Sequence, residues 1–556
     1  MNNETSKTKQ KKITFFAAIL MVIGGSTGAG IYFKSESILN NSHQSLILAI
    51  FCWIFTALAV ITMALALVEI SSSKKNNLSI VGWNQIFNSR LTFNLSKNFM
   101  VYVYLPLTYF FMPLYALISL QQGIGSFMGK EAYVIGTKYD WIIWTAISLL
   151  ITIYFAIVPS LYSKAGDIHN KIILGIKFLP LVFIISIGFI LAFTNKGGTN
   201  LISATVQDQK FNIKTGSPLS SIKSFGAGLG VFLSISAIFF AYDGFYVTSG
   251  IQSEMKEPKK TPYALLIGLL ITTVIYILIA VAMSINGGSF NKMKTFIDAW
   301  WGIKTANIIF GLLNVSIAIG VLGIINSFGM WFSRYVEDLL ICGELPLWFK
   351  YRNRLNANRP IVGMIYSLVI SIPMIVIFSI IGALAYFPAA TYNSFNSAVS
   401  DHLNKLYNFA DLIANWSSLI VYTFIAIAIL GGIRNRKTNL VSVNKKKYFL
   451  VCAYFSMIVT FIAIIITTVA PFVDVIMLAW FEDKSSLIYK ELLIGRIMTI
   501  VTLIIYIVVP YLPHVFEDMY FKKKFGSVEK YMNWRDEQLR IVAEEKLSKE
   551  NKNNMN

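Results

Sequence analysis

Apolar stretches of about 20 residues recur along the whole chain, separated by shorter polar segments. Within them the apolar residues do not alternate with polar ones, as in LPLVFIISIGFILAF at 179–193 and IVTLIIYIVVPYL at 500–512. A helix needs about 20 such residues to cross a hydrocarbon core of roughly 30 Å. Strands of a membrane barrel instead alternate over about ten positions. The pattern therefore predicts an all-α integral membrane protein.

Twelve transmembrane helices are predicted, each bounded to within a few residues. They cover 13–39, 45–70, 99–125, 141–158, 172–193, 227–250, 263–285, 306–332, 361–383, 411–433, 448–473 and 488–512. An even number of spans leaves both ends of the chain on one side of the membrane. The polar tail after Leu512 is predicted to hold a short amphipathic helix. Its run Lys522–Lys524 either touches anionic lipid head groups or is simply solvated.

The composition supports a membrane protein and indicates its orientation. Hydrophobic residues make up 55% of the chain and charged residues 14%, with a mean hydropathy of +0.61. Most of the 48 Lys and Arg residues fall on the side of the N-terminus, and cytoplasmic loops attract such residues. We therefore expect a multi-pass protein of the cell membrane with both termini cytoplasmic. The net charge of +20 does not indicate nucleic-acid binding, because such binding needs a basic patch on a soluble face and the sequence predicts no such face.

Catalytic and metal-binding patterns are not evident in the sequence. The four His and three Cys residues are scattered without metal-ligand spacing. We therefore expect no enzyme activity, no cofactor and no metal site. A channel would need a pore lined by rings of charge or carbonyl groups, and no such pattern is visible.

The first predicted span contains the sequence IGGSTGAGI, with four glycines between Gly24 and Gly30. Each glycine costs a helix about 1 kcal/mol, so this segment favours an interruption. The alternative is close helix packing, because Gly24 and Gly28 have the Gly-x-x-x-Gly spacing.

The sixth predicted span carries a charge, Asp243, followed by Gly244. A charge at bilayer depth is expensive and usually functional. The alternative is that Asp243 merely caps the half-helix that follows it.

The two interrupted spans open two consecutive sets of five, and sets of five have opposite orientations in the membrane. Interrupted helices at matching positions of inverted repeats are typical of a transporter binding site. Backbone amides freed at such a break suit a carboxylate, and freed carbonyls suit an ammonium. Together they form a receptor for both ends of an amino acid.

Four segments resemble motifs of the amino acid–polyamine–organocation (APC) superfamily, in the order in which that superfamily carries them. They are GGSTGAGIYFKS in the first span, ALVEI at the end of the second, FFAYDGFYVTSGIQSEMKEPKKTP in and after the sixth, and SRYVEDLLICGELPLWF after the eighth. The resemblance covers about residues 13–435. Departures include Glu257 in place of an asparagine, Asp243 in place of an uncharged residue, and long loops at 194–226, 286–305 and 386–410.

The resemblance implies a leucine-transporter-like fold and an organisation of the chain. Residues 1–12 would be a cytoplasmic N-terminus, 13–435 a core of five plus five inverted helices, 436–512 two additional helices, and 513–556 a cytoplasmic tail. It also implies a substrate site, in which the Phe240 ring would be a lid. The implied substrate-binding residues are Ser26, Thr27, Gly28, Ala29, Gly30, Phe240, Ala241, Asp243 and Gly244.

One lysine in the fifth span bears on ion coupling. Lys177 matches a lysine that proton-coupled members of the family carry where sodium-coupled relatives hold a sodium ion. The alternative is a lysine near the membrane surface whose ammonium extends to the head groups.

The sequence thus predicts a secondary active amino acid transporter that works by alternating access, with proton coupling and a preference for cationic amino acids as hypotheses. Its expected partners are an amino acid, membrane lipid and protons. The alternatives are a polyamine transporter, an amino acid exchanger or a permease-like sensor that does not transport. The oligomeric state stays open.

Overall fold

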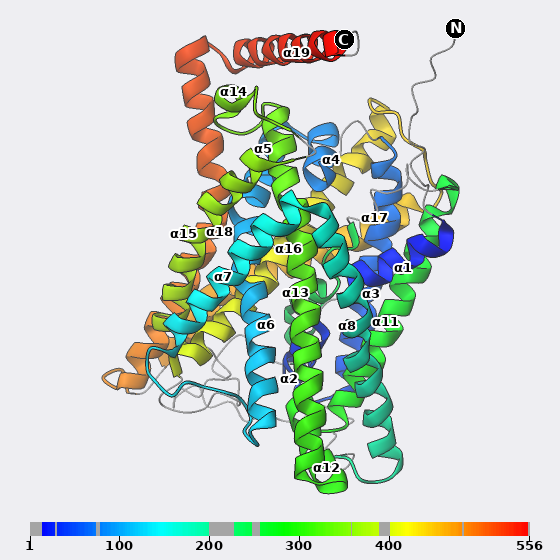
Figure 1. The fold of residues 1–556 in the computed structure, drawn as a ribbon, viewed down its shortest axis with the longest axis vertical. Helices are drawn as coiled ribbons and strands as arrows, with labels where there is room; N and C mark the ends of the chain where they lie inside the picture. Colours follow the sequence, from blue (N-terminus) through cyan, green and yellow to red (C-terminus); the bar gives the residue numbers. More distant parts are fainter. Residues whose placement is uncertain are drawn as a thin grey trace.

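A computed structural model of the chain describes residues 14–27, 30–73, 78–198, 227–246, 256–356, 359–387, 401–480 and 483–553. The regular elements in these ranges are all helices (Figure 1). Ten of them are long and apolar enough to cross a membrane, and the bent pair α1 and α2 brings the number to eleven. The prediction of an all-α, multi-span protein is confirmed, whereas the count of twelve spans and the division into segments remain predictions.

The described part of the first half forms eight α-helices, and a π-helical segment (Met100–Tyr104) joins α5 to α6. Their bounds are α1 (Phe15–Ser26), α2 (Gly30–Asn41), α3 (Leu46–Ser71), α4 (Ser79–Phe87), α5 (Arg90–Phe99), α6 (Leu105–Phe127), α7 (Asp140–Leu161) and α8 (Ser163–Phe193).

The described part of the second half begins with a short apolar helix. Its helices are α9 (Ala227–Ala241), α11 (Thr261–Ser284), α12 (Phe290–Trp301), α13 (Ile303–Ile341), α14 (Trp348–Tyr351), α15 (Ile361–Leu384), α16 (Asp401–Thr438), α17 (Phe449–Met477), α18 (Leu487–Phe525) and α19 (Val528–Asn553). In chain order, α9 opens this half as the α1–α2 pair opens the first.

Both predicted interruptions coincide with helix ends. Between α1 and α2 the helix axis bends by 57°. The helix α9 ends at Ala241, and residues 242–244 form a turn in which Gly244 has φ +99°. This backbone conformation is strained for any residue with a side chain, which explains the glycine.

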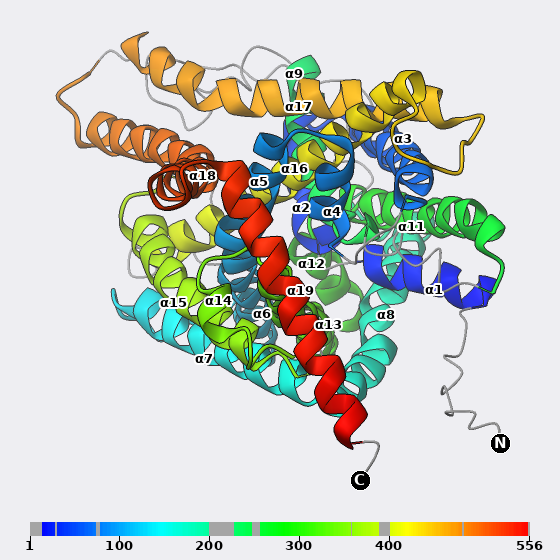
Figure 2. The same cartoon turned by 90° about the horizontal axis from the view of Figure 1, so that it is seen from above.

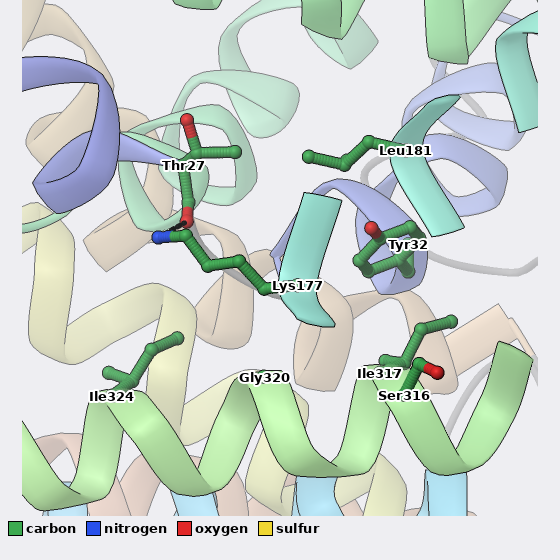
Figure 3. A pocket seen from close by; sticks show the side chains of 8 residues that line it. All are labelled: Thr27, Tyr32, Lys177, Leu181, Ser316, Ile317, Gly320 and Ile324. Carbon is green, nitrogen blue, oxygen red and sulfur yellow. Dashed lines mark hydrogen bonds between the residues drawn. The ribbon is translucent and has the colours of Figure 1, made fainter. Parts of the chain in front are cut away.

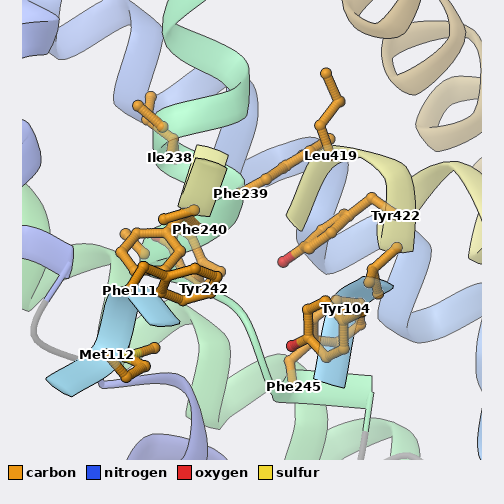
Figure 4. Packing of buried hydrophobic residues seen from close by; sticks show 14 of the residues in the cluster. Tyr104, Phe111, Met112, Ile238, Phe239, Phe240, Tyr242, Phe245, Leu419 and Tyr422 are labelled. Atoms are coloured by element: carbon orange, nitrogen blue, oxygen red, sulfur yellow. The ribbon is translucent and has the colours of Figure 1, made fainter. Parts of the chain in front are cut away.

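Aromatic side chains fix the position of α9 inside the bundle. Phe239 stacks on Tyr422 of α16 with ring centroids 4.0 Å apart, and Phe240 meets Phe111 of α6 edge-on at 5.9 Å (Figure 4). The end of α9 is therefore held between α6 and α16, beside the break in the first span.

The two ends of the bundle differ. The helix α19 lies across one end, over α14, and α12 lies at the other (Figures 1 and 2). The predicted short tail helix is longer than expected, since α18 continues to Phe525 and α19 has 26 residues. In the long loop predicted at 286–305, residues 290–301 form α12. Most of the loop predicted at 194–226, and much of that at 386–410, lies outside the described residues.

Candidate functional site

The break after α1 leaves carbonyl groups of the last helical turn without helical partners. Two side chains from other helices supply donors to them, while the Thr27 hydroxyl adds a second donor at 2.6 Å to the Ile23 oxygen, which already accepts from the Thr27 amide. The Lys177 ammonium donates to the Gly24 oxygen at 2.8 Å, and the Tyr276 hydroxyl donates to the Ser26 oxygen at 2.7 Å. The interruption is thus stabilised by groups from α8 and α11, as a protein surrounded by lipid requires.

Tyr276 of α11 also connects the two interrupted spans. Its buried hydroxyl lies 2.8 Å from the carbonyl oxygen of Ala241, the last residue of α9. A hydroxyl has one proton, so the oxygens of Ser26 and Ala241 share a single donor. One hydrogen-bonding group therefore holds the ends of α1 and α9 at the same place.

Two glycines allow the backbones of the interrupted spans to approach each other. A Cβ atom built on Gly30 would lie 2.9 Å from the Ala241 Cα atom, and one on Gly244 would lie 3.1 Å from the Gly25 oxygen. The first distance is shorter than packed carbon atoms tolerate. Gly30 is therefore needed for contact between α2 and α9, apart from any role in ligand binding.

Asp243 lies in the turn after α9, and the donors to its carboxylate in the described part of the chain are all neutral. They are the hydroxyl of Tyr104 at 2.7 Å, that of Ser418 at 3.2 Å and the amide of Gly244 at 3.0 Å. The Tyr246 hydroxyl lies 3.1 Å from that of Tyr104. A hydroxyl has one proton, so the Tyr246 hydroxyl donates either to the Tyr104 oxygen or to the Asp243 carboxylate, which it also contacts. The carboxylate is held by a chain of hydroxyl groups.

Tyr104 is the last residue of the π-helical segment between α5 and α6. Such segments are rare in helices and occur often at functional sites. The Tyr104 side chain is buried, and its ring lies near that of Phe328 in α13. The irregular turn thus belongs to the surroundings of Asp243.

Lys177 points from α8 toward the break, and its ammonium lies 3.4 Å from the Thr27 oxygen as well as 2.8 Å from that of Gly24 (Figure 3). It borders a cavity of about 20 Å³, which is room for one water-sized group. The cavity is lined by Thr27, Tyr32, Lys177, Leu181, Ser316, Ile317, Gly320 and Ile324. The ammonium therefore faces the protein interior between α1 and α13.

An ion pair between a fully buried lysine and a partly exposed aspartate lies on the other side of the break, one turn into α2. The Lys34 ammonium pairs with Asp411 of α16, and Lys34 has no exposed surface. The Tyr115 hydroxyl donates to Asp411 at 2.7 Å and accepts from Lys34 at 3.0 Å. The same ammonium lies 4.7 Å from the ring centre of Phe240. Helices α2, α6, α9 and α16 are thus joined around one charge pair.

The predicted residues Ser26, Thr27, Gly30, Phe240, Ala241, Asp243 and Gly244 cluster around the two breaks, while Gly28 and Ala29 lie outside the described residues. The sequence interpretation missed the groups that surround them. These are Lys34, Tyr104, Tyr115, Tyr276, Asp411 and Ser418. A usable signal existed for Lys34 and Asp411, because each is a charge within or at the edge of an apolar span. No comparable signal marks the hydroxyl groups, since tyrosine and serine are common in membrane helices.

Comparison with known proteins gives one relative that matches nearly the whole chain and one that matches a smaller part of it at lower identity. The chain is 46% identical to an uncharacterised protein of Mycoplasma pneumoniae over 557 residues, which covers 96% of this chain and 99% of that protein. It is 24% identical to the serine/threonine exchanger SteT of Bacillus subtilis, over 62% of this chain and 72% of the exchanger.

Solved structures are similar to this chain at lower sequence identity. The complex of MhsT with L-phenylalanine matches with 15% identity and a TM-score of 0.49, covering 82% of this chain and 97% of MhsT. A manganese transporter of Eremococcus coleocola matches with 13% identity and a TM-score of 0.44, covering 89% of this chain and 94% of the transporter.

The family comparison decides the identity. A family described as amino acid permease matches residues 13–497, which contain most of the predicted spans. The family membership implied by the sequence motifs is thereby confirmed. The chain belongs to the amino acid permease family and is a multi-pass membrane transporter of amino acids.

Proposed function

We propose that this protein is a secondary active transporter that binds its amino acid between the two interrupted spans. The observation that carries the proposal is the shared donor Tyr276, which holds the ends of α1 and α9 together at 2.7 and 2.8 Å. Two interrupted helices meeting at one point present both amide and carbonyl groups without helical partners. Such a point can bind the carboxylate and the ammonium of an amino acid.

The substrate class follows from Asp243. Its donors in the described residues are neutral, and a carboxylate near the membrane centre costs roughly 2.5 kcal/mol or more when it lacks a cation. A cationic amino acid such as lysine, arginine or ornithine would supply that cation on binding. We therefore propose a preference for cationic amino acids, with binding of the α-ammonium of any amino acid as the alternative.

Proton coupling is proposed for Lys177. Burial disfavours the charged form of a lysine, and the Gly24 oxygen favours it. Opening of the contact between α1 and α8 would remove that oxygen and help the lysine release a proton. The ammonium would act where a sodium ion acts in other transporters, so uptake would need no sodium.

Alternating access would require the Lys34–Asp411 charge pair to open. Lys34 and Asp411 join α2 to α16 on the α2 side of the break. The Lys34 ammonium lies over the Phe240 ring. Separation of the pair would open a path to Phe240 and the bound substrate. With both termini in the cytoplasm of the cell, as the charge bias favours, this path would lead outward.

Exchange of one amino acid for another is the second candidate. It is favoured by the relative of Bacillus subtilis, which is a serine/threonine exchanger. Polyamine transport is a further alternative, because Asp243 would bind any organic cation, and a permease-like sensor would bind without transport.

Purified protein in liposomes tests the proposal. We expect saturable uptake of labelled lysine or arginine driven by a proton gradient, without substrate inside. Uptake only with internal amino acid would identify an exchanger. Preference for putrescine or spermidine would identify a polyamine carrier. Ligand-induced thermal stabilisation without uptake or counterflow would identify a sensor.

A further inference from the structure

A second cavity lies at the end of the bundle that carries α19, away from the interrupted spans. It has a volume of about 530 Å³ and lies between α5, the segment from Gly343 to Lys350, the end of α18 and the start of α19. Its walls are rich in aromatic side chains, among them Trp348, Tyr520 and Trp534. A cavity of this size takes a ligand much larger than a water molecule.

The wall formed by α18 is continuous with the lipid-facing surface of that helix. Exposed apolar residues recur at helical spacing along α18, at Ile497, Val501, Ile504, Val508, Leu512, Phe516 and Tyr520. Phe516 and Tyr520 lie four and eight residues beyond Leu512, or about 6 and 12 Å along the axis. The polar layer of a bilayer is about 5–8 Å thick on each side, so Phe516 falls among the head groups and Tyr520 just outside them. The cavity therefore opens toward the membrane surface.

The cations of the cavity fall into two groups. Three of them are already paired, since Arg90 bonds to Asp518, Lys97 to Glu517 and Arg535 to Glu344. Among the described residues, the ammonium groups of the exposed Lys350 and Lys524 interact only with aromatic side chains. Lys350 lies over the Tyr351 ring, and Lys524 donates to the Tyr520 hydroxyl at 3.1 Å.

We propose that this cavity binds an anionic phospholipid of the adjacent leaflet. Lys350 and Lys524 would bind the phosphate, and an acyl chain would follow Phe516 toward the membrane interior. The charge is complementary, because the two lysines have no carboxylate partner among the described residues while the neighbouring cations do. The lipid would then connect the α18–α19 corner with the segment that follows α13, independently of the substrate site.

Native mass spectrometry of the full chain tests the site. Protein from liposomes of equal phosphatidylglycerol and phosphatidylcholine is transferred to mild detergent, and retained lipids are counted. The double variant Lys350→Gln/Lys524→Gln removes the cavity lysines. The control Lys522→Gln/Lys523→Gln removes two exposed lysines of the same helix that do not line the cavity. All four are exposed, so neither variant disturbs the core.

We expect wild type and control to retain phosphatidylglycerol in preference to phosphatidylcholine, and the cavity variant to bind it about tenfold more weakly. Equal losses in both variants would mean a diffuse basic surface and would overturn the proposal. Equal retention of the two lipids by wild type would also overturn it. Displacement of the lipid by millimolar glycerol 3-phosphate would assign the site to a soluble phosphate compound instead.

Discussion

The ammonium of Lys177 lies 2.8 Å from the carbonyl oxygen of Gly24, so a charge on α8 stabilises the C-terminal end of α1. Carbonyl groups carry the negative end of a helix dipole, which favours a cation there. The contact exists only because α1 stops at Ser26 and leaves its last carbonyl groups unpaired. The position of α1 is thereby linked to the charge of Lys177.

The first prediction concerns this link. Wild-type uptake should not require sodium and should rise as the pH on the substrate side falls. Lys177→Ala should lose the pH response and most of the uptake, because a charge-assisted bond worth about 1.5–3 kcal/mol is removed. Initial rates in liposomes at several pH values measure this. The variant Lys164→Ala, an exposed lysine on the same helix, should behave like wild type. Strict sodium dependence of wild-type uptake would rule out the role given to Lys177.

The interruptions could be predicted from sequence because they depend on local chemistry. Gly24, Gly25 and the pair Asp243–Gly244 oppose a regular helix whatever surrounds them. The partners that satisfy the broken ends could not be predicted, since Lys177, Tyr276 and Tyr104 come from other helices and meet the breaks only after packing. Their identity depends on three-dimensional neighbours that a single sequence does not specify.

In two of the family motifs, at the end of the second span and after the eighth, a carboxylate binds groups of other segments of the chain. Glu69 of ALVEI pairs with Arg436 at 2.6 Å and accepts from the Lys446 amide. Glu337 of SRYVED accepts from the amides of Asn356 and Gly363 at 2.7 and 2.5 Å. Both carboxylates are buried. A motif can thus identify a family without marking its binding site.

The second prediction concerns the pair of Lys34 and Asp411. Removing one partner of a buried ion pair leaves an uncompensated charge and costs about 3–5 kcal/mol. Lys34→Met and Asp411→Leu should each lower the thermal midpoint strongly. The double variant should recover most of the stability, because neither charge remains. Differential scanning fluorimetry of the four proteins gives the coupling between the two sites.

In the same four proteins, transport activity should not follow thermal stability. If the pair closes one side of the substrate path, the double variant should bind substrate but transport it abnormally. Additive losses of stability, or normal transport by the double variant, would contradict the closure described for these residues.

The third prediction compares three glycines. Gly30→Ala should be destabilising by about 1–3 kcal/mol, because the new methyl group meets the Ala241 backbone. Gly244→Ala should be similar, because φ is +99° there. Gly25→Ala should be neutral or slightly stabilising, since no atom lies within 4 Å of the added carbon. Thermal midpoints of the purified variants measure the order, and a loss at Gly25 equal to that at Gly30 would contradict it.

The fourth prediction concerns the charge of Asp243. Asp243→Asn keeps the shape of the side chain but removes the charge. Lysine and arginine uptake should fall roughly ten- to a hundredfold, the range that a charge-assisted bond of about 1.5–3 kcal/mol represents. Neutral amino acids should be transported as well as before or better. Competition assays against labelled arginine in liposomes measure the change.

A control separates the charge of Asp243 from the position of its side chain. Tyr104→Phe removes the hydroxyl that donates to the carboxylate at 2.7 Å and leaves the charge intact. This variant should bind all substrates somewhat more weakly and keep the preference for cations, because the carboxylate is less well held but still present. Equal losses for cationic and neutral substrates in Asp243→Asn would instead assign the carboxylate to the α-ammonium group. Retained binding with lost pH dependence would make Asp243, rather than Lys177, the proton carrier. A wild-type protein that ignores lysine, arginine and ornithine would exclude the proposed preference altogether.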